Sequence, residues 1–219
     1  MRAVLKSEEI PQHDAWGMLL FLFLLGFVAQ FLLLRSAESL FPSHSIELLA
    51  LIVKIFVYLA IFVFCLIRFG NISVIELVPD RRDALILLVA LMIEFWVFGL
   101  LVGSEGIRND RHDAIRDLPA LQYWLGVSIV VGWGPFFEEA LFRRYFLEIQ
   151  RQHYSTGVAI LITASVGTLF HFNLELAVLR LVWHFSQEVF FSLVYVKSRL
   201  GVAVLVHAFV NALVVFLSR

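Results

Sequence analysis

Long apolar stretches alternate with short polar segments along the whole chain. Each stretch approaches the roughly 20 residues that an α-helix needs to cross the hydrocarbon core of a membrane. The strict apolar/polar alternation of membrane β-barrel strands is missing, so the pattern predicts transmembrane helices. The seven predicted spans are residues 16–34, 48–67, 84–102, 121–150, 157–172, 176–196 and 201–217.

The composition favours lipid-facing helices over a soluble core. Hydrophobic residues make up 61% and charged residues 16% of the 219 positions, whereas a soluble domain has about 25% charged residues. We therefore expect an all-α, polytopic transmembrane bundle whose surrounding partner is the lipid bilayer. The net charge of −1 lacks the basic footprint of a nucleic-acid-binding protein, and the single cysteine, Cys65, excludes an internal disulfide or a cysteine-based metal cluster.

Lys and Arg residues gather in the loops on one side of the predicted bundle, and such residues mark the cytoplasmic side of a membrane protein. That side holds Arg2, Lys6, Arg68, Arg81, Arg82, Arg144, Arg151, Lys197 and Arg199. The other side holds Arg35, Arg108, Arg111, Arg116 and Arg219. We therefore predict an integral, multi-pass membrane protein with a cytoplasmic N-terminus, whose first span is a retained anchor.

Ionisable residues within the fourth predicted span are functional candidates, because a charge in lipid is costly unless it is paired or hydrated. Pro135 follows Gly134, and this pair predicts a break in the helix, with a second helix starting at the proline. Unpaired backbone N–H groups at such a start would favour anions. The second part of the span contains Glu138, Glu139 and Arg143.

The spacing of these three residues suggests a division of roles. Glu139 and Arg143 are four residues apart, which places them on one helix face in a favourable order for an ion pair. We expect Arg143 to hold Glu139 ionised. Glu138 points in another direction, and in a pocket of low polarity its pKa would be raised to a value suited to a general base. A purely structural ion network is the alternative.

Two later spans bring further polar side chains to a similar depth. His171 lies near the end of the fifth span, and His207 and Asn211 share a face of the seventh because they are four residues apart. At a rise of about 1.5 Å per residue, Glu138 and Asn211 lie about 15 Å, His171 about 21 Å and His207 about 9 Å from the cytoplasmic ends of their spans. The sequence therefore predicts one polar site shared by three spans.

These residues resemble the CPBP family of intramembrane endopeptidases, which includes CAAX proteases and bacteriocin-processing (Abi) proteins and is related to the type II CAAX prenyl endopeptidase. Glu138-Glu139-x-x-x-Arg143, then His171, then His207-x-x-x-Asn211 match its motifs in order and spacing. The resemblance covers roughly residues 120–217. We therefore divide the chain into residues 1–119, with a polar segment and three accessory spans, and a catalytic helical core of residues 120–219.

The resemblance implies a glutamic-type intramembrane protease without a cofactor. Carried over by residue, Glu138 with His171 activates a water molecule, and His207 with Asn211 stabilises the oxyanion, a task suited to an imidazole and an amide N–H. The implied partner is a membrane-associated protein or peptide, cleaved near the membrane surface in a polar cavity open to the cytoplasm. CAAX, leader-peptide and C-terminal sorting-tail processing all fit, and the implied place is a prokaryotic cytoplasmic membrane.

One position departs from the family pattern. The family usually has Phe four residues before the middle histidine, where this chain has Gly167. That position lies on the same helix face as His171, so the change opens space beneath the imidazole. We expect Phe170 or Phe172 to fill this space, with consequences for packing and substrate shape more than for chemistry.

Other chemistries and functions stay open. Two His and two Glu side chains also suit a zinc-dependent version of the same protease, although no His-Glu-x-x-His pair lies on one helix. A non-catalytic bacteriocin-immunity or peptide-binding membrane protein would use the same polar residues without cleavage. A transporter is a further alternative, but the sequence lacks the inverted repeats typical of that class. Serine chemistry is disfavoured because Ser128 is followed by Ile129 in place of glycine.

The sixth span contains three polar residues spaced by four, Arg180, His184 and Glu188, which therefore lie along one face. We expect them to line the substrate-binding cavity, with Arg180 as an anion contact. A polar ladder satisfied within the bundle is the alternative. Lys54 and Glu94 suit a structural ion pair between the second and third spans.

Overall fold

The computed structural model describes residues 16–17, 43–101, 118–170 and 178–217, and the regular structure in these ranges is helical. The predicted all-α fold is confirmed. Apart from the long helix of residues 120–153, described below, the helices are α2 (Ser43–Phe69), α3 (Val74–Leu77), α4 (Arg81–Leu101), α9 (Thr156–Phe170), α10 (Val178–Lys197) and α11 (Leu200–Leu217). Six of the seven predicted spans match a helix within a few residues. The first falls outside the described residues, except for Trp16 and Gly17.

The fourth predicted span is one continuous helical element from Ala120 to His153, and the break predicted at Gly134-Pro135 is therefore wrong. Its parts are α6 (Ala120–Val127), the π-helical segment η2 (Ser128–Trp133), α7 (Gly134–Glu139), the π-helical segment η3 (Ala140–Leu147) and α8 (Glu148–His153). A π-helical turn is wider than an α-helical one and is often found at functional sites. Here two such segments flank the turn that contains both glutamates.

The wider turn explains why Pro135 does not break the helix. In a regular α-helix a proline ring clashes with the carbonyl group four residues earlier. Just before Pro135, the Gly134 N–H donates to the Ile129 carbonyl five residues earlier, so the turn is already widened. A Cβ atom on Gly134 would lie 2.9 Å from that oxygen. The Gly134 N–H is thus used within the helix and is not available to an anion.

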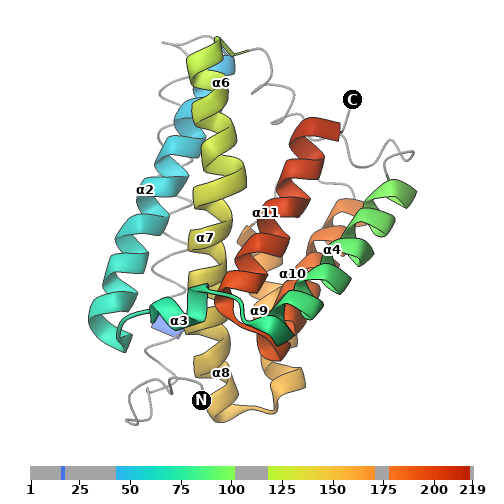
Figure 1. Ribbon diagram of the computed structural model, residues 1–219. Helices are drawn as coiled ribbons and strands as arrows, with labels where there is room; N and C mark the ends of the chain where they lie inside the picture. Colours follow the sequence, from blue (N-terminus) through green and yellow to red (C-terminus); the bar gives the residue numbers. More distant parts are fainter. Residues whose placement is uncertain (1–15, 18–42, 102–117, 171–177, 218–219) are drawn as a thin grey trace.

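The long helix and α11 form the centre of the bundle (Figure 1). In this view α11 lies between the long helix and α4, with α9 and α10 behind, and α2 runs beside the long helix. One apolar cluster joins α2 to α7 and η3 and includes Tyr58, Phe137 and Tyr145. A second surrounds α11 and includes Phe191 and Val206. This packing brings the polar side of α7 against α11.

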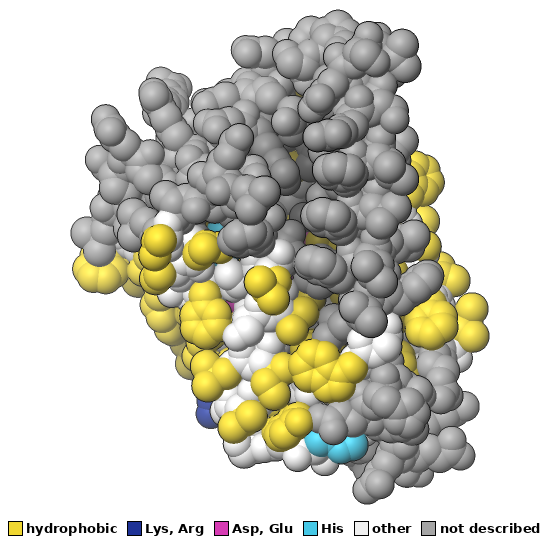
Figure 2. Space-filling model, turned by 180° about the vertical axis from the view of Figure 1, so that it is seen from behind, with side chains coloured by type: hydrophobic (Ala, Val, Ile, Leu, Met, Phe, Trp, Pro, Cys, Tyr) yellow, Lys and Arg dark blue, Asp and Glu magenta, His cyan; other side chains and the backbone are white. Residues whose placement is uncertain are grey.

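Part of the bundle has the length and surface of a membrane protein. Among the described residues, the helices Ala120–His153 and Leu200–Leu217 are long and apolar enough to cross a membrane, and Ile55–Ile67 and Thr156–Leu169 are shorter apolar helices. Large apolar side chains lie on the outside, and Figure 2 shows that hydrophobic groups dominate the described part of one face. Such a surface is expected where helices contact lipid.

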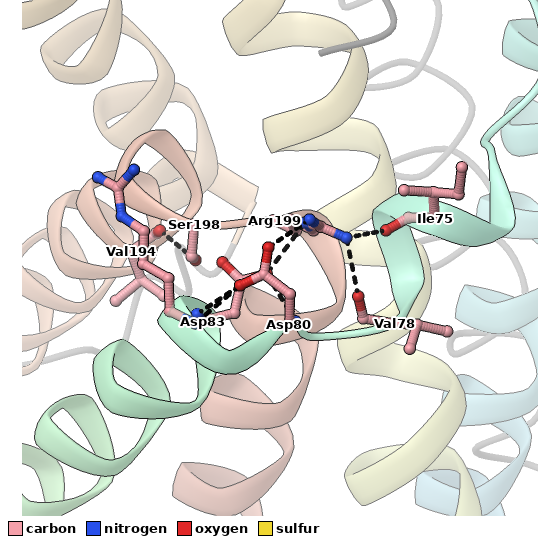
Figure 3. A network of polar contacts seen from close by, with 8 residues as sticks. Ile75, Val78, Asp80, Asp83, Val194, Ser198 and Arg199 are labelled. Atoms are coloured by element: carbon pink, nitrogen blue, oxygen red, sulfur yellow. Dashed lines mark hydrogen bonds and ion pairs between the residues drawn. The ribbon is translucent and has the colours of Figure 1, made fainter. Parts of the chain in front are cut away.

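One arginine ties the start of α4 to the turn between α10 and α11 (Figure 3). Arg199 forms ion pairs with Asp80 and with Asp83, whose Oδ2 lies 3.0 Å from Arg199 Nε. Its Nη1 also donates to the carbonyl oxygens of Ile75 and Val78, at 3.0 and 3.2 Å. These contacts fix the segment that leads into α4 against the last two helices.

The short helix α3 is held against the same end of the bundle. Glu76 of α3 forms an ion pair with Arg144 of η3, whose Nε lies 2.6 Å from Glu76 Oε2. A Cβ atom on Gly201 would lie 2.0 Å from the Leu77 carbonyl oxygen, so α11 begins in close contact with α3 only because this residue is glycine. The N-terminal helices are therefore fixed to the helices that contain the candidate site.

Candidate active site

Helix α7 places two adjacent glutamates in the interior of the bundle. The side chains of Glu138, Glu139 and Arg143 are buried. Arg143 Nε lies 3.2 Å from Glu139 Oε2, so the predicted ion pair between them is present. A charge removed from water is tolerated in a folded protein when it is paired in this way. The pair therefore fixes one carboxylate and leaves Glu138 to face a different partner.

That partner comes from α11. His207 is buried, with its Nδ1 atom 2.8 Å from Glu139 Oε1 and its Nε2 atom 3.7 Å from Glu138 Oε2. An ionised carboxylate accepts hydrogen bonds only, so His207 donates from Nδ1 to Glu139 and turns Nε2 toward Glu138. The two glutamates, adjacent in sequence, thus lie on the two edges of one imidazole ring.

An aromatic side chain fixes the plane of this imidazole. Phe191 of α10 stacks on His207 with ring centroids 4.6 Å apart and planes inclined by 15°. The guanidinium carbon of Arg143 lies 5.7 Å from the centre of the same Phe191 ring. The sequence did not single out Phe191, because one phenylalanine among 22 gives no signal of its own.

Helix α10 adds a third buried carboxylate. Glu188 Oε2 lies 2.8 Å from Arg143 Nη2, and the same nitrogen donates to the Glu188 backbone carbonyl at 3.2 Å. The Glu188 carboxylate occupies the space next to Gly167 of α9, where a Cβ atom would lie 2.3 Å from Glu188 Oε2. The space opened by Gly167 thus contains a carboxylate. Of the fillers we predicted, Phe172 and the side chain of Phe170 lie outside the described residues.

Asn211 lies one turn beyond His207 on α11 and contacts the widened part of the long helix. Its amide Nδ2 donates to the Val130 carbonyl oxygen at 2.8 Å. In the π-helical pattern, the N–H five residues after Val130 would be that of residue 135, which is proline and has none. The Asn211 side chain therefore supplies a hydrogen bond that the helix lacks. An amide group has two donor hydrogens, so this contact uses one of them.

The remaining predicted residues are placed to different degrees. His171 lies outside the described residues, so its position relative to Glu138 stays a prediction. Arg180 is in α10, but its side chain is outside the described part. His184 is partly buried on α10, one turn before Glu188. Substrate contacts of Arg180, His184 and Glu188 remain predictions, although Glu188 itself is part of the ion-pair cluster.

Two further polar contacts connect α2 and α4 with this region. The buried carboxylate of Glu94 in α4 accepts a hydrogen bond of 3.1 Å from Gln187 Nε2 in α10. Lys54, the partner that the sequence suggested for Glu94, has a side chain outside the described part. The buried Tyr58 of α2 interacts with Glu138. Neither Gln187 nor Tyr58 is marked by sequence spacing, since each depends on which helices are neighbours.

The zinc-dependent alternative requires several His, Cys, Asp or Glu side chains around one ion. Within the described ranges, no group of three His, Cys, Asp or Glu side chains is arranged to hold a metal ion. His171, the second histidine of that hypothesis, is not among these residues.

A comparison with protein families finds a match for the second half of the chain. Residues 119–213, somewhat less than half of the sequence, match the family model described as Type II CAAX prenyl endopeptidase Rce1-like. No curated protein and no solved structure matches the chain significantly. The matched segment contains every site residue described above except the contacts from α2 and α4. The chain thus contains a domain of the Rce1-like type II CAAX prenyl endopeptidase (CPBP) family, which implies a protease with a protein or peptide substrate.

Proposed function

We propose that the chain is an intramembrane endopeptidase in which Glu138 activates the attacking water. The observation that supports this most is the position of His207, with one ring nitrogen on Glu139 and the other 3.7 Å from Glu138 Oε2. Two atoms at this separation can both hydrogen-bond to a single water molecule. A base and an imidazole beside one water are the groups that peptide hydrolysis requires.

The reaction that we propose needs one proton carrier. Glu138 takes a proton from the water as its oxygen bonds to the carbonyl carbon of the scissile peptide. The carbonyl oxygen becomes an oxyanion, to which the second amide N–H of Asn211 and, in the imidazolium form, the Nε2–H of His207 donate. Breakage of the C–N bond then passes the proton from Glu138 to the leaving amine. His171 is proposed to assist Glu138.

The membrane arrangement that we propose has seven spans and a cytoplasmic N-terminus. The turn between α10 and α11, the start of α4 and α8 lie at the same end of the bundle (Figure 1). This end contains the described basic residues Arg81, Arg144, Arg151 and Arg199. It would face the cytoplasm by the positive-inside rule. Residues 1–119 would then act as accessory helices for the core of residues 120–219.

The test compares protein termini in membranes and medium of the native host expressing wild type or Glu138→Gln at equal level. Glutamine keeps the size and polarity of the side chain but cannot take the proton. We expect specific new termini to be present with wild type and absent with the variant, as measured by mass spectrometry. These termini would also identify the substrate. Addition of a chelator to the purified protein distinguishes the zinc-dependent alternative, because a chelator should abolish cleavage only if the protease needs zinc.

Glu148→Gln is the matched control, because Glu148 pairs with Arg151 at the end of the long helix and both are partly exposed. It removes the same charge outside the candidate site and should leave all termini unchanged. If wild type and Glu138→Gln yield identical termini while an associated phenotype persists, the chain is a binding or immunity protein and not a protease.

A further inference from the structure

Gly167 is a glycine in the last turn of α9, where the helix provides no reason for one. Its conformation is not left-handed, and glycine is unfavourable within a helix. The reason is the neighbour on α10, because a Cβ atom would lie 2.3 Å from Glu188 Oε2 and 2.5 Å from Glu188 Cδ. The glycine therefore makes the space in which the Glu188 carboxylate lies.

Within that space, Glu188 is held by the same guanidinium that holds Glu139. Arg143 directs Nε to Glu139 at 3.2 Å and Nη2 to the Glu188 carboxylate at 2.8 Å. Its Nη2 also donates to the Glu188 carbonyl oxygen, which accepts a second hydrogen bond from Ser192 Oγ at 2.8 Å. The backbone and the side chain of Glu188 thus both determine where the guanidinium lies.

A continuous chain of contacts then leads to the proposed reacting groups. From Glu188 it passes through Arg143 to Glu139, and from Glu139 Oε1 to His207 Nδ1 at 2.8 Å. Every side chain in this series is buried. Buried ion pairs have restricted geometry, because any shift leaves a charge without its partner. A change at Glu188 is therefore transmitted to the orientation of His207.

The geometry points to Glu188 as a positioning residue of the site. We infer that its carboxylate, seated over Gly167, fixes Arg143 and through it Glu139 and His207, without contacting the substrate. This inference rests on the proposed peptidase function. It differs from a substrate-binding role for Glu188 in one measurable respect. A positioning residue affects kcat, whereas a residue that only binds substrate affects KM.

The kinetic test uses a synthetic peptide that spans the cleavage site identified in the Glu138→Gln comparison. For Glu188→Gln, which keeps an oxygen acceptor for Arg143, we expect kcat to fall by about 10-fold, and for Glu188→Ala by about 100-fold, since misplacement of about 1 Å can cost this much. KM should stay within about 2-fold of wild type, because Glu188 does not contact the substrate and its loss leaves substrate binding in the ground state unchanged. A rise in KM with kcat unchanged would overturn the inference.

The structural half of the inference is tested without any substrate. In the full chain purified in detergent, Gly167→Ala should lower the thermal midpoint by roughly 2–10 °C, because the added methyl group collides with the Glu188 carboxylate. In the Glu188→Ala background, Gly167→Ala should lower the thermal midpoint much less, since the carboxylate with which the methyl group collides is absent. Equal losses in both backgrounds would mean that Glu188 does not occupy this space.

Gly157→Ala is the matched control on the same helix, since nothing lies within 4 Å of a Cβ atom at that position. It should not lower the midpoint in either background, because alanine is at least as favourable as glycine in a helix where its methyl group meets no neighbour. The two proposals fail in different ways. Absence of wild-type cleavage refutes the peptidase, whereas normal cleavage with an unaltered kcat in Glu188→Ala refutes the positioning role alone.

Discussion

One guanidinium serves two carboxylates at the centre of this molecule. Arg143 reaches Glu139 through Nε and Glu188 through Nη2, which uses the fixed, planar fork of arginine. Lysine has the same charge, but its donors radiate from a single nitrogen. The site therefore depends on the shape of the cation as well as on its charge.

We predict that Arg143→Lys gives a folded protein with impaired catalysis. The ammonium group can pair with one carboxylate at a time, so Glu139 and His207 lose their fixed orientation. Cleavage of the peptide should fall by about 100-fold, with the protein still monodisperse in detergent. Arg151→Lys, at the pair with Glu148 within α8, should cleave like wild type. Wild-type cleavage by Arg143→Lys would contradict the shared-cation geometry.

At the scale of residues, the sequence predicts contacts within one helix far better than contacts between helices. The pair of Glu139 with Arg143 follows from a spacing of four, and it is present. Depth along the spans predicted that His207 would lie near the glutamates, but not which nitrogen faces which carboxylate. Spacing and depth placed Glu188 in the wall of the site, but its pairing with Arg143 could not be predicted, because it depends on how closely α9 and α10 approach at Gly167.

Among the elements, the long helix departs most from its prediction. The rule that proline ends a helix assumes α-helical geometry. Just before Pro135, the backbone hydrogen bond spans five residues, which avoids the clash between the proline ring and the preceding turn. The carbonyl oxygen of Val130 accepts a hydrogen bond from Asn211 of α11 instead. The sequence does not show that Pro135 and Asn211 are connected, because these two residues are 76 positions apart and on different helices. Asn211 therefore has a structural role in addition to the catalytic one that we propose.

These two roles of Asn211 can be separated with Pro135. Asn211→Ala leaves the Val130 carbonyl without its side-chain donor, a loss of about 1 kcal/mol in stability for a partly buried group. Pro135→Ala adds a backbone N–H to this part of the helix. We therefore expect the double variant to regain thermal stability in detergent relative to Asn211→Ala.

Cleavage should not recover in parallel, because the proposed oxyanion donor is still missing from the double variant. The Pro135→Ala single variant, which keeps Asn211, is the control for any effect of the proline itself. A double variant that regains both stability and cleavage would show that Asn211 serves the helix alone. If stability does not recover, Asn211 does not compensate for the backbone N–H that Pro135 lacks.

For the whole molecule, the apolar pattern predicts where the helices are but not which of them touch. The bounds of α2, α4, α9, α10 and α11 follow the apolar stretches closely. The four-residue α3 was not predicted, because so short a segment has no periodicity to recognise. Contacts such as Glu94 with Gln187 join helices far apart in the sequence, and hydropathy alone contains no information about such neighbours.

The orientation of the molecule in the membrane can be tested with single cysteines. In a Cys65→Ala background, we expect Gln122→Cys to react with a membrane-impermeant maleimide in intact cells. Ser155→Cys should react only after the membrane is permeabilised, because the basic end of the bundle is predicted to be cytoplasmic. Both positions are exposed, so exposure does not separate them. The opposite labelling pattern would reverse the predicted topology.

The ionic connection at Arg199 also has a consequence for biogenesis. Asp80 and Arg199 are 119 positions apart, so the ribosome completes the acidic partners long before the basic one. While the intervening helices are made and inserted, Asp80 and Asp83 have no Arg199 to pair with, and at the end of the bundle they can stay hydrated at little cost. The connection forms when the turn after α10 emerges. Synthesis of the last two helices thus completes the attachment of α4, whose contacts with the rest of the bundle are mainly to α11.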